Sequence, residues 1–141
     1  MILFCDTSAL VKLYVEEPSS AELRALVHAA EAVAACRIAY AEARAAFARR
    51  GRESAADSAK LDQARAALTS DWPHYLTIEV TQPLVQLAGD YADVFALRAY
   101  DSVQLAAART TAQHANDEVG FACFDHRLNK AAAILGLTTH F

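Results

Sequence analysis

The amino-acid sequence predicts an α/β fold in which a central parallel sheet of four to five short strands is flanked by about seven helices. Short apolar segments alternate along the 141 residues with longer segments of helical pattern, which is typical of a parallel sheet with both faces covered. Alanine, the strongest helix former, occupies 33 positions. The candidate strands are residues 2–5, 32–36, 76–80 and 119–124. With no repeat or low-complexity linker, residues 1–141 are expected to form one domain.

The first strand leads into two predicted helices. The first helix is expected over residues 8–16, because Pro18 disfavours helical geometry in the residue before it. Ser19 is followed three positions later by Glu22, which predicts a capping box at the start of the second helix. The leucines and valine of this second segment give it one apolar face.

After the second strand, a strongly helical pattern covers residues 40–52. Gly51 and Ser54 are expected to end this helix, since glycine weakens a helix and serine favours a cap. Ser54 together with Asp57 predicts the cap of a further helix, which runs to about Thr69. The middle of the chain is therefore expected to contain two consecutive helices before the third strand.

The third strand candidate, LTIEV, has the clearest strand pattern, with alternating β-branched residues. Thr81, shortly before Pro83, starts a predicted helix that runs to about Leu97, and another helix is expected over 101–115. A last helix follows the fourth strand and ends before Gly136, which is well placed for its C-terminal cap. The closing segment LTTHF predicts a short final strand.

Composition excludes several classes of protein. The chain is 55% apolar and 21% charged, as ordinary globular proteins are, and its net charge of −4 argues against binding nucleic acid through bulk charge. No apolar run approaches a bilayer span and no export signal begins the chain, so a cytoplasmic location is expected. Cys5, Cys36 and Cys123 lie far apart in apolar segments, which predicts buried reduced thiols rather than a zinc cluster or disulfides.

Four acidic residues are expected at one edge of the predicted sheet. Asp6 ends the first strand and Asp125 ends the fourth, and the carboxyl ends of parallel strands meet where ligands bind. Glu42 lies near the start of the helix after the second strand, and Asp101 opens the helix at 101–115. Each acid alone is explained by capping or by the helix dipole. We expect, beyond this, that all four converge.

Convergence of four carboxylates has a chemical consequence. Carboxylates a few ångströms apart repel by roughly 1–4 kcal/mol per pair, so some take up protons unless a cation compensates them. Ligands that are all oxygen select hard cations such as Mg²⁺ or Mn²⁺ over zinc. Such an ion binds a phosphate oxygen and lowers the pKa of a bound water. The pattern therefore indicates phosphodiester hydrolysis.

Four segments resemble the acidic motifs of PIN-domain ribonucleases, and in particular of VapC-like toxins from bacterial type II toxin–antitoxin modules. In chain order these segments are FCDTSALVKLYVEE, AYAEARAAF, RAYDSVQLAAA and FACFDHRLNKAAAILGL. Each motif is weak alone, but their order and spacing are specific, and the resemblance covers nearly the whole chain. It implies a Mg²⁺- or Mn²⁺-dependent endoribonuclease that hydrolyses RNA with metal-activated water and leaves a 3′-hydroxyl.

The resemblance also implies roles for individual residues. The metal-binding, catalytic acids would be Asp6, Glu42, Asp101 and Asp125. Thr7 or Ser8 would supply a hydroxyl that positions water or phosphate. Many relatives carry threonine two residues before the fourth acid, whereas Cys123 stands here, so the hydroxyl that would help to position Asp125 is missing. A homodimer and a cognate antitoxin protein, which lays a chain segment across the toxin and blocks its site, are the implied partners.

The arginines have two possible interpretations. Arg49, Arg50 and Arg52 form a basic patch that either follows an RNA backbone or is a solvated helix face. Arg98 and Arg127 lie close in sequence to two of the acids, where they either bind phosphate or remain surface and ion-pair residues.

Other functions fit the sequence less well. A haloacid-dehalogenase-like phosphatase needs a second aspartate two positions after the first, where Ser8 stands. A receiver domain needs a phosphoacceptor at the end of the third strand, where Thr81 stands. A non-catalytic module of the same fold, binding RNA or protein, remains the alternative of a different class, although it has no need of clustered charge.

Overall fold

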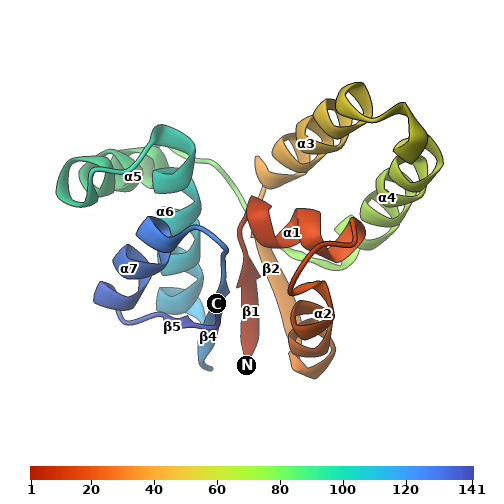
Figure 1. Ribbon diagram of the computed structural model, residues 1–141. Coiled ribbons are helices and arrows are strands. Elements are labelled where there is room, and N and C mark those ends of the chain that lie inside the picture. Colours follow the sequence, from red (N-terminus) through yellow and green to blue (C-terminus); the bar gives the residue numbers. More distant parts are fainter.

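The computed structural model describes residues 1–141 and confirms the predicted α/β class (Figure 1). The strands are β1 (Ile2–Cys5), β2 (Ala32–Cys36), β3 (Leu76–Ile78), β4 (Val119–Ala122) and β5 (Thr138–Thr139). The helices are α1 (Thr7–Tyr14), α2 (Ser20–Ala29), α3 (Ala39–Glu53), α4 (Ser58–Asp71), α5 (Gln82–Phe95), α6 (Ala99–His114) and α7 (His126–Ile134). Two 3-10 helices, η1 (Ala55–Asp57) and η2 (Trp72–His74), flank α4. No helix is both long and apolar enough to cross a bilayer.

The five strands form one sheet in the order β3-β2-β1-β4-β5, and every pairing is parallel. Ile2 of β1 lies opposite Ala32 of β2 on one side and Val119 of β4 on the other. The strand order therefore reverses at β1, with β2 and β3 to one side and β4 and β5 to the other. In open parallel sheets ligands bind at such a switch point, beyond the carboxyl ends of the strands.

Alternating side chains of the central strands build two separate cores. Phe4 of β1 belongs to the core under α5, α6 and α7, where it stacks on Phe121 with the ring centroids 6.0 Å apart. Leu3 and Cys5 point the other way, into the core under α1 and α2. Figure 1 shows these two groups of helices on opposite sides of the sheet. All three cysteines are buried and free, as predicted.

The predicted capping box at Ser19 is wrong. Ser19 has a φ of 72°, in the left-handed region, and its side chain makes no capping hydrogen bond. The buried neighbour Ser20 satisfies the turn instead, because its Oγ accepts from the Glu17 N–H at 3.0 Å and donates to the Val15 carbonyl at 3.4 Å. In the turn after Pro18, the side-chain hydrogen bonds are therefore made by Ser20 and not by Ser19.

The predicted end of the helix at Ser54 is confirmed, since Ser54 is the C-cap residue of α3, but the predicted break at Gly51 is wrong. The helix α3 continues through Gly51, where a Cβ atom would lie 3.3 Å from Leu61 Cδ1 of α4. Glycine costs a helix about 1 kcal/mol, but here it lets α4 pack closely on α3 around buried Phe47. Neither Ser54 nor Asp57 caps a helix through its side chain; η1 fills this turn and α4 begins at Ser58.

Candidate active site

Two aspartates flank the switch point of the sheet. Asp6 follows β1 directly, and its backbone N–H donates to the Ala122 carbonyl at the end of β4, at 3.1 Å. Because β4 ends at Ala122 rather than at residue 124, Asp125 follows a short turn. Both carboxylates cap helices, since Asp6 accepts from the Ala9 N–H at 3.1 Å and Asp125 from the Leu128 N–H at 2.8 Å. The capping interpretation of each acid is therefore confirmed, and it does not exclude a second role.

Asp6 is a buried carboxylate without a cationic partner. Asp6 is only 4% exposed, and its carboxylate forms no ion pair. The Ser8 hydroxyl donates to Oδ1 at 2.6 Å and the Cys123 thiol donates to Oδ2 at 3.2 Å. Burial raises the pKa of Asp6 to about 6, although these hydrogen bonds oppose the rise. Cys123 thus supplies a polar hydrogen at the position where threonine was expected.

The raised pKa of Asp6 predicts that, in the presence of a chelator, the free energy of unfolding depends on pH. This pKa rises from 3.8 to about 6 on folding, so the folded protein binds the Asp6 proton more tightly than the unfolded chain. The resulting stabilisation is complete below about pH 4 and is lost as the pH rises through 6. Over this range the free energy of unfolding of wild type, relative to Asp6→Asn, is expected to fall by about 3 kcal/mol. Urea denaturation at several pH values, with EDTA, measures the difference; a difference independent of pH would contradict the raised pKa.

Glu42 lies on the first turn of α3 and is tied to two other helices. The Thr7 hydroxyl of α1 donates to Glu42 Oε1 at 2.9 Å. The side-chain amide of Gln104, on α6, donates to the same oxygen at 2.9 Å and to Thr7 Oγ1 at 3.1 Å. Since Thr7 follows Asp6 in the chain, these contacts hold Glu42 next to the end of β1.

Asp101 is the third residue of α6 and is held by no side-chain hydrogen bond. Burial raises its pKa first, and the negative charge of Asp125 raises it further, while Arg98 opposes the shift. Asp101 also contributes to the raised pKa of Asp6. The electrostatic coupling therefore joins Asp6, Asp101 and Asp125, three acids that are far apart in the sequence.

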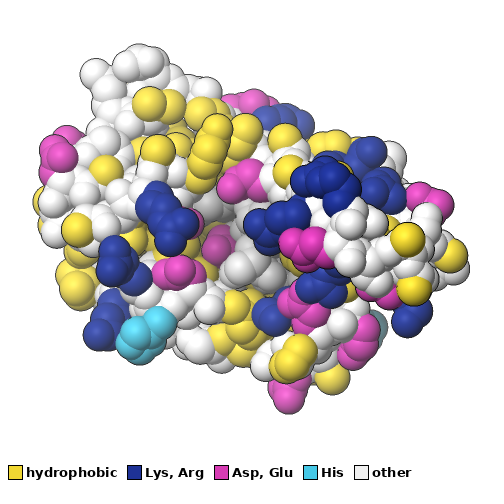
Figure 2. Space-filling view, turned by 45° about the horizontal axis from the view of Figure 1, so that its top comes forward, with side chains coloured by type: hydrophobic (Ala, Val, Ile, Leu, Met, Phe, Trp, Pro, Cys, Tyr) yellow, Lys and Arg dark blue, Asp and Glu magenta, His cyan; other side chains and the backbone are white.

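Part of this site lines one cavity of about 650 Å³, which we call the acidic cavity. Its wall contains Asp101 and Asp125, and also Thr7 and Ser8. Asp6 and Glu42 do not line it, but each shares a hydrogen bond with a hydroxyl that does. Figure 2 shows this end of the molecule, with acidic side chains in a central hollow and lysine and arginine side chains on both sides. The four acids are thus brought to one place, two on the wall and two directly behind it.

The four acids do not form a ready-made metal centre. No group of three or more histidine, cysteine, aspartate or glutamate side chains is arranged to hold an ion as it stands. None of the four is neutralised by an ion pair either. Their donor atoms are all carboxylate oxygens, which fits a hard divalent cation and not zinc. A cation bound by all four acids would have to draw their carboxylates closer together.

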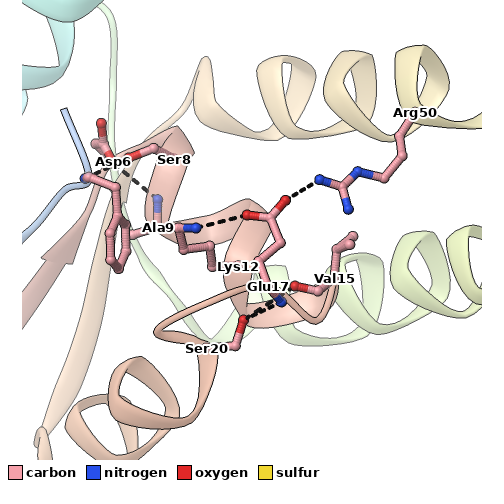
Figure 3. A network of polar contacts seen from close by, with 9 residues as sticks. Asp6, Ser8, Ala9, Lys12, Val15, Glu17, Ser20 and Arg50 are labelled. Atoms are coloured by element: carbon pink, nitrogen blue, oxygen red, sulfur yellow. Dashed lines mark hydrogen bonds and ion pairs between the residues drawn. The ribbon is translucent and has the colours of Figure 1, made fainter. Parts of the chain in front are cut away.

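Basic side chains also line the acidic cavity, and sequence reasoning missed part of this set. The lining bases are Lys12, Arg49, Arg50 and Arg98. Figure 3 shows Glu17 between two of them: it accepts from Lys12 Nζ at 2.9 Å and forms an ion pair with Arg50. Arg52 is not part of the wall, and Arg127 instead donates to the Ala96 carbonyl at 3.5 Å. The one available signal for Lys12 was its position four residues after Ser8, on the same face of α1.

Comparison with known proteins gives a consistent result. The family model described as PIN domain matches residues 3–134. Ribonuclease VapC45 of Mycobacterium tuberculosis (strain CDC 1551 / Oshkosh) is 32% identical over 135 residues, covering 96% of this chain and 92% of that protein. Ribonuclease VapC46 of M. tuberculosis (strain ATCC 25618 / H37Rv) is 31% identical over 136 residues, covering 96% and 93%.

Solved structures share the fold at lower identity. FitAcB from Neisseria gonorrhoeae superposes with a TM-score of 0.70 at 19% identity, covering 100% of this chain and 97% of that one. VapBC2 from Rickettsia felis, solved bound to a DNA fragment from its promoter, gives a TM-score of 0.66 at 13% identity, covering 99% and 98%. At these identities the likeness shows the fold alone.

Proposed function

The chain belongs to the PIN-domain family and is VapC-like, and from this premise we propose that it is a divalent-metal-dependent endoribonuclease that hydrolyses RNA phosphodiesters. The observation that carries the proposal is the acidic cavity. Asp101 and Asp125 lie on its wall, and Asp6 and Glu42 lie behind the wall, where each accepts a hydrogen bond from a hydroxyl that lines the cavity. No ion pair neutralises any of the four acids. Unpaired carboxylates that raise one another's pKa are typical of a functional site rather than of a structural network.

Mg²⁺ or Mn²⁺ fits this set of donors, and we assign its ligands to Asp6, Glu42, Asp101 and Asp125. When bound, such a cation neutralises the phosphate charge and lowers the pKa of a water ligand. The hydroxyls of Thr7 and Ser8 fix the orientation of Glu42 and Asp6, to which they donate at 2.9 Å and 2.6 Å. The side chains of the cavity therefore supply both the negative charge for the ion and its alignment.

The basic wall of the acidic cavity would bind the RNA backbone. Arg98, whose charge acts on Asp101, and Lys12 of α1 both belong to that wall. Lys12 and Arg50 both pair with Glu17, and neither forms an ion pair with any of the four acids. A local patch of this kind binds a phosphate chain even though the net charge of the protein is −4.

The role of the arginine patch can be tested by the salt dependence of RNA binding. Arg49 lines the acidic cavity and is exposed, whereas Arg52 is exposed but outside the wall. We expect Arg49→Gln to lower the slope of log K against log salt by roughly 0.7, the value for one phosphate contact on a single strand. The matched control Arg52→Gln should leave the slope unchanged. Equal slopes for both variants and wild type would show that the patch is only a solvated helix face.

We assign to the protein the toxin role in a toxin–antitoxin pair, with a cognate antitoxin as partner. A cavity of about 520 Å³ between α1, α2 and α4, lined partly by Leu13, Val15 and Leu61, offers a groove for a segment of such a protein. A homodimer is the second proposed assembly. Val80 and Tyr100 are exposed on the rim of another, apolar cavity, which favours a protein contact there. The cytoplasmic location stays a prediction.

Incubation of the purified protein with single-stranded RNA and Mn²⁺, followed by analysis of the ends, tests the proposed reaction. The expected products carry a 3′-hydroxyl and a 5′-phosphate, because water attacks the phosphorus and the 3′-oxygen leaves. Cyclic phosphate ends would indicate attack by the RNA 2′-hydroxyl and would overturn the proposed mechanism. RNA binding without any cleavage would support the non-catalytic alternative.

A further inference from the structure

Gln104 is a buried glutamine beside the acidic cavity; it lies inside the motif RAYDSVQLAAA, but the motif assigns it no role. It lies on α6, three residues after Asp101, and is 2% exposed. Glutamine is usually found on protein surfaces, because burying its amide is costly unless both polar atoms find partners. The contacts of its amide group therefore decide what its burial costs.

The amide nitrogen of Gln104 has two partners, and both belong to the site. It donates to Glu42 Oε1 at 2.9 Å and to Thr7 Oγ1 at 3.1 Å, while the Thr7 hydroxyl donates to that same Glu42 oxygen at 2.9 Å. Residues from α1, α3 and α6 thus meet on one carboxylate oxygen. No hydrogen bond goes to Glu42 Oε2, so one oxygen of this acid is fixed and the other is free to accept a ligand.

The other end of the Gln104 amide is unsatisfied. Its carbonyl oxygen, Oε1, is buried and has no hydrogen-bond partner. A buried acceptor without a partner typically costs about 1–3 kcal/mol, which an apolar side chain of similar shape avoids. For stability alone, methionine or leucine would be favoured at this position. The glutamine is therefore explained by the hydrogen bonds that its N–H groups donate to Glu42 and Thr7.

We propose that Gln104 is a positioning residue, which aligns Glu42 through Oε1 so that Oε2 binds the divalent cation. This inference rests on the proposed function, because the cation belongs to it. Gln104 touches neither the ion nor RNA, and acts only through Glu42 and Thr7. Residues that orient metal ligands typically contribute 10–100-fold to metal affinity or activity.

Gln104→Met tests this role, because methionine keeps the length of the side chain and removes both polar atoms. Calorimetric titration with Mn²⁺, without RNA, is expected to show roughly 10-fold weaker binding. The Tm in EDTA is expected to stay the same or rise, since the unsatisfied carbonyl is gone. The matched control is Gln113→Met, which makes the same change at an exposed position of the same helix and should alter neither quantity.

The outcomes separate this inference from the function on which it rests. If wild type binds no Mn²⁺, the proposed function itself fails, and the role of Gln104 with it. If wild type binds Mn²⁺ and Gln104→Met binds it equally well, only the positioning role is overturned. A Gln104→Met variant that unfolds, or melts well below wild type in EDTA, would also overturn it, because the amide would then serve the fold rather than the site.

Discussion

Replacing Asp101 by asparagine is expected to abolish RNA cleavage while leaving the protein folded. The Asp101 carboxylate accepts no side-chain hydrogen bond, and burial together with Asp125 makes its charge unfavourable, as its raised pKa shows. Asparagine has nearly the same shape and no charge, so it removes repulsion and breaks no contact. Loss of one cation ligand is expected to raise the activation barrier of cleavage by several kcal/mol. A rise of roughly 4 kcal/mol would slow cleavage by a factor of about 1,000.

Cleavage of an end-labelled RNA measures the rate, and thermal unfolding followed by circular dichroism checks the fold. The matched control is Asp93→Asn, which removes a charge from an exposed position on α5 and should cleave like wild type. Cleavage at the wild-type rate by a clean preparation of Asp101→Asn would count heavily against the assigned site. A variant that fails to fold would instead show that the carboxylate has a structural role.

Removing divalent cations is expected to have a comparably large effect. EDTA should stop cleavage, and Mg²⁺ or Mn²⁺ should restore it, because the carboxylate oxygens of the site prefer hard cations. A cation that binds only the folded state also stabilises it, by about 2.7 kcal/mol at 100 times its Kd. The Tm of wild type should therefore rise with Mn²⁺, and that of Asp6→Asn should rise much less. Cleavage that persists in EDTA would show that the reaction does not need the cation.

The arrangement of the site follows from local sequence features to a considerable extent. The apolar run before Asp6 predicts a buried strand, and β1 ends one residue before this acid. Parallel pairing then places Asp6 next to the turn that carries Asp125, because the carboxyl ends of β1 and β4 meet at one edge. Helix starts face the same edge, which accounts for Glu42 and Asp101. These features depend on short segments and on the general geometry of parallel sheets.

Other features depend on contacts between distant segments, which no local pattern encodes. Gln104 contacts Thr7 across 97 positions and Glu42 across 62; its position three residues after Asp101 places it near the site, but no local pattern shows which residues its amide contacts. Glu17 pairs with Arg50 only because α1 and α3 pack together. Glycine stands at position 51, inside α3, where a Cβ atom would crowd Leu61 of α4. Tertiary packing decides each of these positions and overrides the local preference.

Titration with Mn²⁺, followed by calorimetry on wild type and on Asp6→Asn, tests most directly whether carboxylates from distant segments share one cation. Wild type is expected to take up Mn²⁺, and the loss of the charge at Asp6 is expected to abolish or strongly weaken that uptake. Wild-type protein that ignores Mn²⁺, or an Asp6→Asn variant that binds it as tightly as wild type, would contradict a shared cation site at the carboxyl ends of β1 and β4.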